Sequence, residues 1–309
     1  MRPRCYGSAP RRVDAAVAVP QERLRRDRAA DMVWRMAEPP RPTAPYTHGH
    51  HESVLRAHRW RTVENSAAYL TPYLTPGRSV LDVGCGPGTI TVDMAGRVTP
   101  GEVIGIDPSV DVIDSARAAA GARFPTGSGP RFEVGDVAEL PWEGDSFDVV
   151  HAHQVLQHLA DPVAALREMR RVCRTSGVVA ARDADYEAMT WFPDDPGLDA
   201  WLDLYRRVAR SNGAEPDAGR RLVSWARAAG FTEVVPSASA WCYSSAEDRT
   251  WWGELWAQRV TESAFGHQAV TSGLATWADL QEMAAAWRRW AGSVDGWFAV
   301  LHGEILATP

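Results

Sequence analysis

The chain has 309 residues, a net charge of −6 and 45% hydrophobic residues. This length predicts one large domain, or one domain with a lid, and the hydrophobic content supplies a sizeable core. The acidic balance argues against nucleic acid as a main partner. No apolar run reaches the ~18 residues that a membrane span needs, so we expect no membrane span.

The cysteine pattern bears on the redox compartment. Cys5, Cys85, Cys173 and Cys242 lie far apart and form no CxxC pair. This spacing argues against a zinc site or a disulfide framework and fits a reducing cytoplasm, where we expect the protein. The N-terminus also lacks the continuous apolar core of a signal peptide.

Residues 1–45 are rich in Arg, Ala and Pro and show no sustained apolar periodicity. We expect a disordered tail there, and a basic arm for a partner is the alternative. The stretch THGHH (47–51) brings three histidines together, but without Cys, Asp or Glu at matching spacing. We therefore expect no metal site. A helix is expected from His51 to about Leu74.

Short apolar runs then alternate with helical stretches. The runs are 79–83, 102–107, 131–136, 147–154 and 177–185. This spacing is typical of βαβ units and predicts a parallel sheet with helices on both faces. In such sheets ligands bind beyond the carboxyl ends of the strands.

The chain becomes rich in helical patterns after residue 185. Residues 232–244 predict a long strand interrupted by Pro236, and 297–306 predict a final strand. About 50 residues with several tryptophans separate these strands, too many for a plain loop. We therefore expect a core over 46–244, a helical cap inserted at 245–295 and a closing strand of the core at 296–309.

The stretch LDVGCGPGTIT (81–91) places Gly84, Gly86 and Gly88 directly after the first run. A strand, GxGxG and a helix bring backbone close to a nucleotide, because glycine permits the turn and carries no obstructing side chain. The dinucleotide fingerprint is GxGxxG, and Asp82 would repel a pyrophosphate while suiting a cationic ligand. These features disfavour a nicotinamide-dependent dehydrogenase.

Two later carboxylates define the expected ligand. Asp107 ends the second run, where a carboxylate can accept hydrogen bonds from both ribose hydroxyls. Asp136 ends the third run and can accept from an adenine amino group. The ligand implied has a ribose and an adenine but no pyrophosphate.

LDVGCGPGTIT, GIDPS, GDVAELPWEGDSFDVVHAHQVLQHL and SGVVAARDAD together resemble the motif series of class I S-adenosylmethionine-dependent methyltransferases. Within that superfamily the chain resembles the ubiquinone/menaquinone C-methyltransferase-like small-molecule group, over roughly residues 46–235. The resemblance implies an α/β fold: a Rossmann-like, seven-stranded, mostly parallel sheet with helices on both faces and, here, the inserted cap. It implies S-adenosylmethionine as cofactor and S-adenosylhomocysteine as product.

The resemblance also implies the residues that bind this cofactor. Asp82 would face the methionine amino group, the glycine loop would line methionine and ribose, and Asp107 would hold the ribose hydroxyls. Cys85 would contribute its backbone amide, since a lone cysteine is more often packing than a nucleophile. The complete expected set is Asp82, Gly84, Cys85, Gly86, Gly88, Asp107, Pro108, Ser109, Asp136, Val137, His153 and Gln154.

A sulfonium donor is already activated, so most of the catalysis can come from proximity and orientation in an in-line displacement. A general base is needed only where the acceptor must lose a proton, and an ordinary histidine pKa near 6.5 suits it. His153 and His158 are the candidates. We expect His151 and His153 to point to opposite faces of the sheet, so that only one faces the ligand. Further candidates for acceptor contact are Asp183, Asp185 and Tyr186.

The tryptophans after residue 240 bear on the acceptor. Some pack the cap, and others are expected to line an apolar pocket. The sequence therefore predicts methyl transfer to an apolar or aromatic small molecule by a monomer or homodimer. The alternative is an enzyme of this fold that keeps the adenosyl ligand but catalyses a rearrangement without methyl transfer.

Overall fold

The computed structural model describes residues 58–125 and 127–309. The predictions for the tail over 1–45 and for THGHH therefore lie outside the described residues. In the described part, no helix is both long enough and apolar enough to cross a membrane.

The central feature is a sheet in the order β3-β2-β1-β4-β5-β8, in which β5 and β6 pair successive stretches of one edge of β8 and β7 pairs its other edge. The strands are β1 (Val80–Val83), β2 (Val103–Asp107), β3 (Arg131–Val134), β4 (Phe147–His153), β5 (Cys173–Ala184), β6 (Thr190–Phe192), β7 (Glu233–Tyr243) and β8 (Trp297–Thr308). The first five run parallel, and β8 is antiparallel to its neighbours. The Rossmann-like, mostly parallel sheet is confirmed, with the short β6 in addition to the seven predicted strands.

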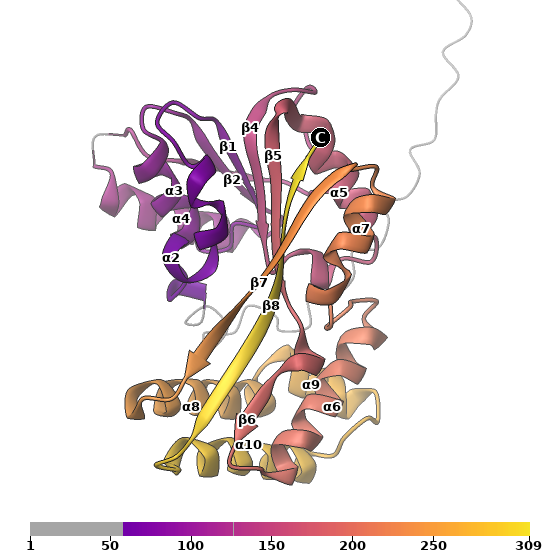
Figure 1. Ribbon diagram of the computed structural model, residues 1–309. Coiled ribbons are helices and arrows are strands. Elements are labelled where there is room, and N and C mark those ends of the chain that lie inside the picture. Colours follow the sequence, from indigo (N-terminus) through magenta and orange to yellow (C-terminus); the bar gives the residue numbers. More distant parts are fainter. Residues whose placement is uncertain (1–57, 126) are drawn as a thin grey trace, which may run out of the picture. The chain divides into compact units, whose positions relative to one another are not determined.

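Helices cover both faces of this sheet. Those of the first half are α2 (Val63–Ser66), α3 (Thr89–Val98), α4 (Val110–Arg123) and α5 (Pro162–Val172). In the second half of the chain, α7 (Leu222–Ala228) also packs on the sheet, whereas α6 (Pro196–Ser211), α8 (Ala246–Glu262), α9 (Ala264–Thr271) and α10 (Trp277–Gly292) lie at the far end of β7 and β8 (Figure 1). Figure 1 shows α2, α3 and α4 on one side and α5 and α7 on the other. Because successive side chains of a strand point to opposite faces, both helix layers pack on the sheet. Val80 packs toward the α2 and α3 side, and Leu81 packs toward the α5 and α7 side.

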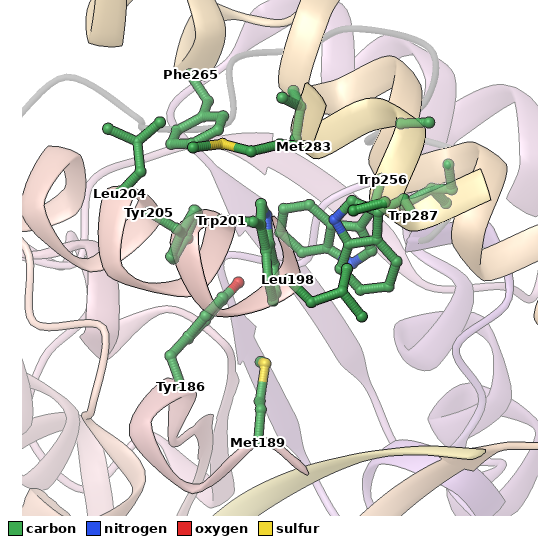
Figure 2. Close-up of a cluster of buried hydrophobic side chains, with 14 of the residues drawn as sticks. Tyr186, Met189, Leu198, Trp201, Leu204, Tyr205, Trp256, Phe265, Met283 and Trp287 are labelled. Atoms are coloured by element: carbon green, nitrogen blue, oxygen red, sulfur yellow. The ribbon is translucent and has the colours of Figure 1, made fainter. Parts of the chain in front are cut away.

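A second apolar cluster lies among α6, α8, α9 and α10 beside β6 and the far half of β8. At its centre the ring of Trp201, fully buried, lies 4.5 Å from that of Trp256 and 4.7 Å from that of Trp287, both edge-to-face (Figure 2). Such aromatic pairs add to the energy of burial itself. Many of the tryptophans after residue 240 therefore stabilise this helical region, while the domain boundaries drawn from the sequence stay predictions.

The ribbon of β7 and β8 connects the two apolar regions. The strands pair from Glu233 opposite Thr308 to Tyr243 opposite Phe298 without a register shift. In Figure 1 they run from the parallel sheet to α8 and α10. The predicted interruption at Pro236 is wrong. Because β7 is an edge strand, a residue without an N–H can keep its place there opposite Ile305.

The expected single helix over 51–74 is also wrong in its described part. Residues 63–66 form α2, and a 3₁₀ helix, η1 (Ala68–Tyr73), follows. Thr62 caps α2 by accepting from the amide of Asn65 at 3.3 Å, which starts a new helix at that point. Pro72 lies within η1, where the missing N–H disfavours continuous α-helix.

Candidate functional site

The glycine loop between β1 and α3 adopts left-handed backbone at all three glycines, with φ of 63° at Gly84, 56° at Gly86 and 79° at Gly88. A Cβ at Gly84 would collide with Val155, and one at Gly88 would lie 2.6 Å from Phe132. At Gly86 the nearest atom would be Nδ1 of His58, 3.8 Å away. The two ends of the loop are therefore closely packed, whereas its middle has room for a Cβ at ordinary contact distance.

Asp107 ends β2 beside this loop. Its carboxylate accepts from the amide of Gly86 at 3.3 Å and from the amide of Ser109 at 3.0 Å. Ser109 caps α4, with its hydroxyl accepting from Val112 at 3.4 Å, and Pro108 between them is exposed. A half-buried carboxylate thus stands at the edge of the open glycine loop.

The other predicted residues of this region are placed as follows. Asp136 is exposed after β3 and accepts from the amide of Ala138 at 2.9 Å, while the side chain of Val137 is buried. The backbone amide of Cys85 donates to Ile106 at 2.9 Å. Burial, with Asp82 and Asp107 nearby, raises the thiol pKa of Cys85 far above its usual range, which favours the protonated thiol over the nucleophilic thiolate.

Asp82 lies behind the loop, buried in the sheet. Its two oxygens contact the hydroxyl of Thr91 at 2.5 Å and Nδ1 of His151 at 2.8 Å. Both oxygens therefore have partners within the fold. A direct contact of Asp82 with a cofactor amino group stays a prediction.

His151 and His153 share one face of β4, and the expectation that they point to opposite faces is wrong. Residues two apart on a strand project to the same side. His151 lies opposite Asp82 of β1, and His153 lies opposite Arg182 of β5. Both histidines are buried, and only His151 has a hydrogen-bond partner in the described structure.

A buried charged pair, Arg182 of β5 and Glu304 of β8, lies next to His153 in the sheet. Nε of Arg182 lies 3.2 Å from Glu304 of β8, and Glu304 also accepts from the hydroxyl of Ser237 at 2.7 Å. The guanidinium of Arg182 sits 4.9 Å from the centre of the Trp241 ring. Burial lowers the pKa of Arg182 to about 10, and Glu304 opposes this, so the arginine stays charged at neutral pH.

Gln154 directly follows β4 and has a left-handed φ of 54°. Its amide donates to the carbonyl of Arg182 at 2.7 Å, and its side-chain oxygen accepts from Arg61 at 2.5 Å. Its side-chain nitrogen lies 2.9 Å from Nε2 of His302, whose Nδ1 lies 3.0 Å from the carbonyl of Val300. The imidazole therefore donates through Nδ1 and accepts through Nε2, which fixes Gln154 in place.

A narrow cavity opens beside Gln154. Aromatic side chains of β7 and α8 form much of its wall: Trp241, Tyr243, Trp251, Trp252 and Trp256. The ring of Trp60 belongs to the wall too, 5.4 Å from Trp241 and 5.8 Å from Trp251. The polar lining comprises His58, Arg61, Gln154, His158 and Arg259.

The two histidines proposed for catalysis differ in position. His158 lines the cavity, and its Nε2 lies 2.9 Å from the side-chain nitrogen of Gln157. His153 lies beside Trp241 and is not part of the cavity wall. Burial, assisted by Arg61, lowers the pKa of His158 to about 3 and that of His153 well below its ordinary value. Both imidazoles are therefore neutral near pH 7.

Arg61, Tyr243 and Arg259 also line the cavity and are not among the residues predicted from the sequence. For Arg259 a signal existed, since it follows Trp252 and Trp256 by seven and three residues and so shares their face of α8. Arg61 and Tyr243 come to the cavity only through pairing and packing distant in sequence. Within 58–125 and 127–309, no group of three or more His, Cys, Asp or Glu is arranged to hold a metal.

Comparisons with known proteins bear on the family of the chain. A family model described as a methyltransferase domain matches residues 74–230. An uncharacterized methyltransferase of Schizosaccharomyces pombe is 35% identical over 84% of this chain and 95% of its own length. A demethylmenaquinone methyltransferase of Roseiflexus castenholzii is 32% identical over 54% of this chain and 66% of its own.

The fold has a solved counterpart. A phosphoethanolamine N-methyltransferase of Haemonchus contortus, in complex with S-adenosylhomocysteine, aligns with a TM-score of 0.51. It covers 84% of this chain and 58% of that one at 14% identity, which shows a shared fold. The sequence prediction of the family is confirmed: the chain belongs to the class I S-adenosylmethionine-dependent methyltransferases, enzymes whose cofactor is S-adenosylmethionine.

Proposed function

We propose that this methyltransferase acts on an apolar or aromatic small molecule that binds in the cavity beside Gln154. One observation carries the proposal: the open glycine loop and the aromatic cavity share His58. The ring of this residue faces Gly86, its carbonyl accepts from Thr89 at 3.2 Å, and it also lines the cavity. A cofactor on the loop and an acceptor in the cavity would therefore meet at this point.

The residues present fit S-adenosylmethionine. The middle of the glycine loop has the open space that a closely approaching ligand needs, and Asp107 offers a carboxylate for ribose hydroxyls. Asp136 and Val137 follow the neighbouring strand, where we propose that they flank the adenine. Gln154, held on three sides, would stand at the methionine end.

When bound, the cofactor would supply an activated methyl group for in-line transfer to the acceptor, with the electron pair of the carbon–sulfur bond left on sulfur. The chain's own part is to hold the acceptor and exclude water, and the aromatic wall suits both tasks. A histidine pKa of about 3 makes His158 a weak base. We therefore propose that His158 orients the acceptor as a neutral hydrogen-bonding group, and catalysis by His153 stays a prediction.

Isothermal titration with S-adenosylmethionine and S-adenosylhomocysteine, with NADH as control, tests the cofactor site first. We expect saturable binding of the two adenosyl compounds only. Release of S-adenosylhomocysteine with a panel of aromatic acceptors then tests transfer. Conversion of an acceptor without consumption of the bound cofactor would instead favour the rearrangement alternative, and failure to bind either adenosyl compound would contradict the site.

A further inference from the structure

We propose that the cavity recognises an aryl ketone, a flat aromatic ring that carries a carbonyl group, and that the hydroxyl of Tyr243 donates a hydrogen bond to the carbonyl oxygen. This inference deepens the proposed function and rests on it, because it names the acceptor class of that same site and a residue that selects it.

The hydroxyl of Tyr243 is buried without a partner. The side chain is 1% exposed and lines the cavity. Its hydroxyl has no hydrogen-bond partner among the residues that the structure describes. A buried donor of this kind costs free energy, because folding has removed its water and supplied nothing in exchange. A ligand oxygen in the cavity would supply the missing acceptor.

The neighbouring Trp241 shows that the fold can satisfy a donor of this wall. Trp241 lies two residues before Tyr243 on β7, so both side chains project from the same face of the strand, and both line the cavity. The indole N–H of Trp241 donates to the carbonyl oxygen of Asn65 at 2.6 Å. One donor of this stretch of β7 is therefore paired within the fold, and the other is left for the cavity.

The ring of Tyr243 is held in one place. Its backbone pairs with that of Phe298 in the ladder of β7 and β8. The ring stacks on that of Trp252, with 4.3 Å between the centroids and 14° between the planes. The rings of Trp60 and Trp251 each lie 5.9 Å from it. Such contacts fix the orientation of the phenol, so its hydroxyl is positioned before a ligand arrives.

The unpaired groups of this stacked pair suit a carbonyl oxygen. Burial raises the pKa of Tyr243 far above its usual range, so the phenol keeps its proton and can donate. The indole nitrogen of Trp252, which is 4% exposed and also lines the cavity, has no partner in the described chain and can only donate. A carbonyl oxygen has two lone pairs and no hydrogen, so it matches donors.

The aromatic wall favours a neutral ligand over a charged one. Trp60, Trp251 and Trp252 present ring surfaces that bind a flat apolar body. A ketone is uncharged, so it can enter such a wall without the large desolvation cost of an ion. The ketone oxygen would therefore lie at Tyr243, with the aromatic ring against the tryptophans.

The test compares two probes of nearly equal shape, acetophenone and isopropenylbenzene, in which a C=CH₂ group replaces the C=O group. Each probe is titrated into the full chain saturated with S-adenosylhomocysteine, and broadening of the NMR lines of the probe reports binding. The ratio of the two affinities is measured in the wild type and in Tyr243→Phe, which removes only the hydroxyl. The same two probes are used on both proteins, so their different solubilities in water cancel.

We expect Tyr243→Phe to weaken acetophenone binding about tenfold and to leave isopropenylbenzene binding within about threefold. Tyr69→Phe is the matched control. The hydroxyl of Tyr69 is also buried without a partner among the described residues, but Tyr69 does not line the cavity, so the ratio should stay unchanged. An unchanged ratio in Tyr243→Phe, an equal fall in both variants, or no binding of acetophenone to the wild type would overturn the proposal.

Stability of the ligand-free protein separates recognition from a structural role. Because the hydroxyl of Tyr243 has no partner in the described fold, its removal should not lower the thermal midpoint of unfolding. A clear fall in Tyr243→Phe would reveal a partner within the fold and overturn the inference. An unchanged ratio with S-adenosylhomocysteine bound would refute this inference while the proposed function stands. Failure to bind S-adenosylhomocysteine would refute the proposed function itself.

Discussion

Asp82 of β1 and His151 of β4 stand opposite each other in adjacent strands, and 2.8 Å separates the carboxylate oxygen from the ring nitrogen. Both side chains are buried. The other oxygen of Asp82 accepts from Thr91 of α3. The acidic residue of the glycine motif is therefore oriented from behind the loop by a histidine outside the motif.

His151→Leu should lower the free energy of unfolding by about 3 kcal/mol, because it leaves a buried carboxylate oxygen without its partner. Urea unfolding followed by circular dichroism measures the change. His267→Leu on the exposed side of α9 is the control, with an expected change within about 0.5 kcal/mol. Equal losses in the two variants would contradict a special role for the Asp82–His151 pair.

Gly86→Ala should weaken binding of S-adenosylhomocysteine at least about tenfold, because the new methyl group projects into the open middle of the loop. Gly213→Ala is matched to it, since Gly213 also has a left-handed φ, of 80°, and no atom within 4 Å of a new Cβ. Both variants bear a backbone strain of about 1 kcal/mol. If the two affected affinity alike, strain and not occupancy of the loop would explain the result.

Asp107→Ala should weaken binding of the same ligand at least about tenfold, or ~1.4 kcal/mol, if the carboxylate holds the ribose hydroxyls. Asp111→Ala, in the exposed first turn of α4, removes one negative charge nearby and should leave affinity unchanged. Calorimetric titration measures both. Unchanged affinity in Asp107→Ala would contradict the assignment of Asp107 to the ribose hydroxyls.

Asp183 makes the free energy of unfolding depend on pH. Its side chain is buried, one oxygen accepts from the amide of Gln157 at 3.1 Å, and burial raises its pKa to about 7. An unfolded aspartate has a pKa of ~3.9, so between about pH 4 and 7 the folded state holds a proton that the unfolded state has lost. This group therefore lowers stability as pH rises through that window, by up to ~1.4 kcal/mol per unit.

Asp183→Asn should remove this contribution. The difference in unfolding free energy between variant and wild type should grow in the variant's favour from pH 5 to pH 7, as measured by urea unfolding at each pH. Asp199→Asn, at an exposed position of α6, is the control and should show a flat difference. A flat difference for Asp183→Asn as well would mean that the buried carboxyl does not titrate in this range.

Much of the fold follows from local sequence pattern. The runs 79–83 and 102–107 become β1 and β2 because each is apolar, short and followed by turn residues. The position of the glycine loop could be predicted equally well, because the left-handed backbone that the loop requires is one that glycine adopts readily. The prediction at Pro236 was wrong because the position of β7 at the sheet edge, which local pattern does not show, decides there. The prediction for His151 and His153 was wrong because it departed from the two-residue period of a strand.

The cavity was less predictable because its residues meet only through the tertiary fold. Arg61 reaches Gln154 across 93 residues of chain. Tyr243 reaches the cavity through the register of β7 on β8. The sequence shows that tryptophan is frequent in this region. Which tryptophans are buried in packing, such as Trp201, and which line the cavity, such as Trp251, depends on how the helices pack.

The cavity-lining residues Trp241 and Tyr243 of β7 and Val300 of β8 belong to one continuous strand ladder. A long, unbroken antiparallel ladder resists bending, and α8 and α10 join its ends through short links at 244–245 and 293–296. The helical region is thus joined to the parallel sheet by two long paired strands. Trp60 and Arg61, by contrast, line the cavity through side-chain contacts with Trp241 and Gln154 and not through a strand ladder, so their places depend on contacts between residues far apart in the sequence.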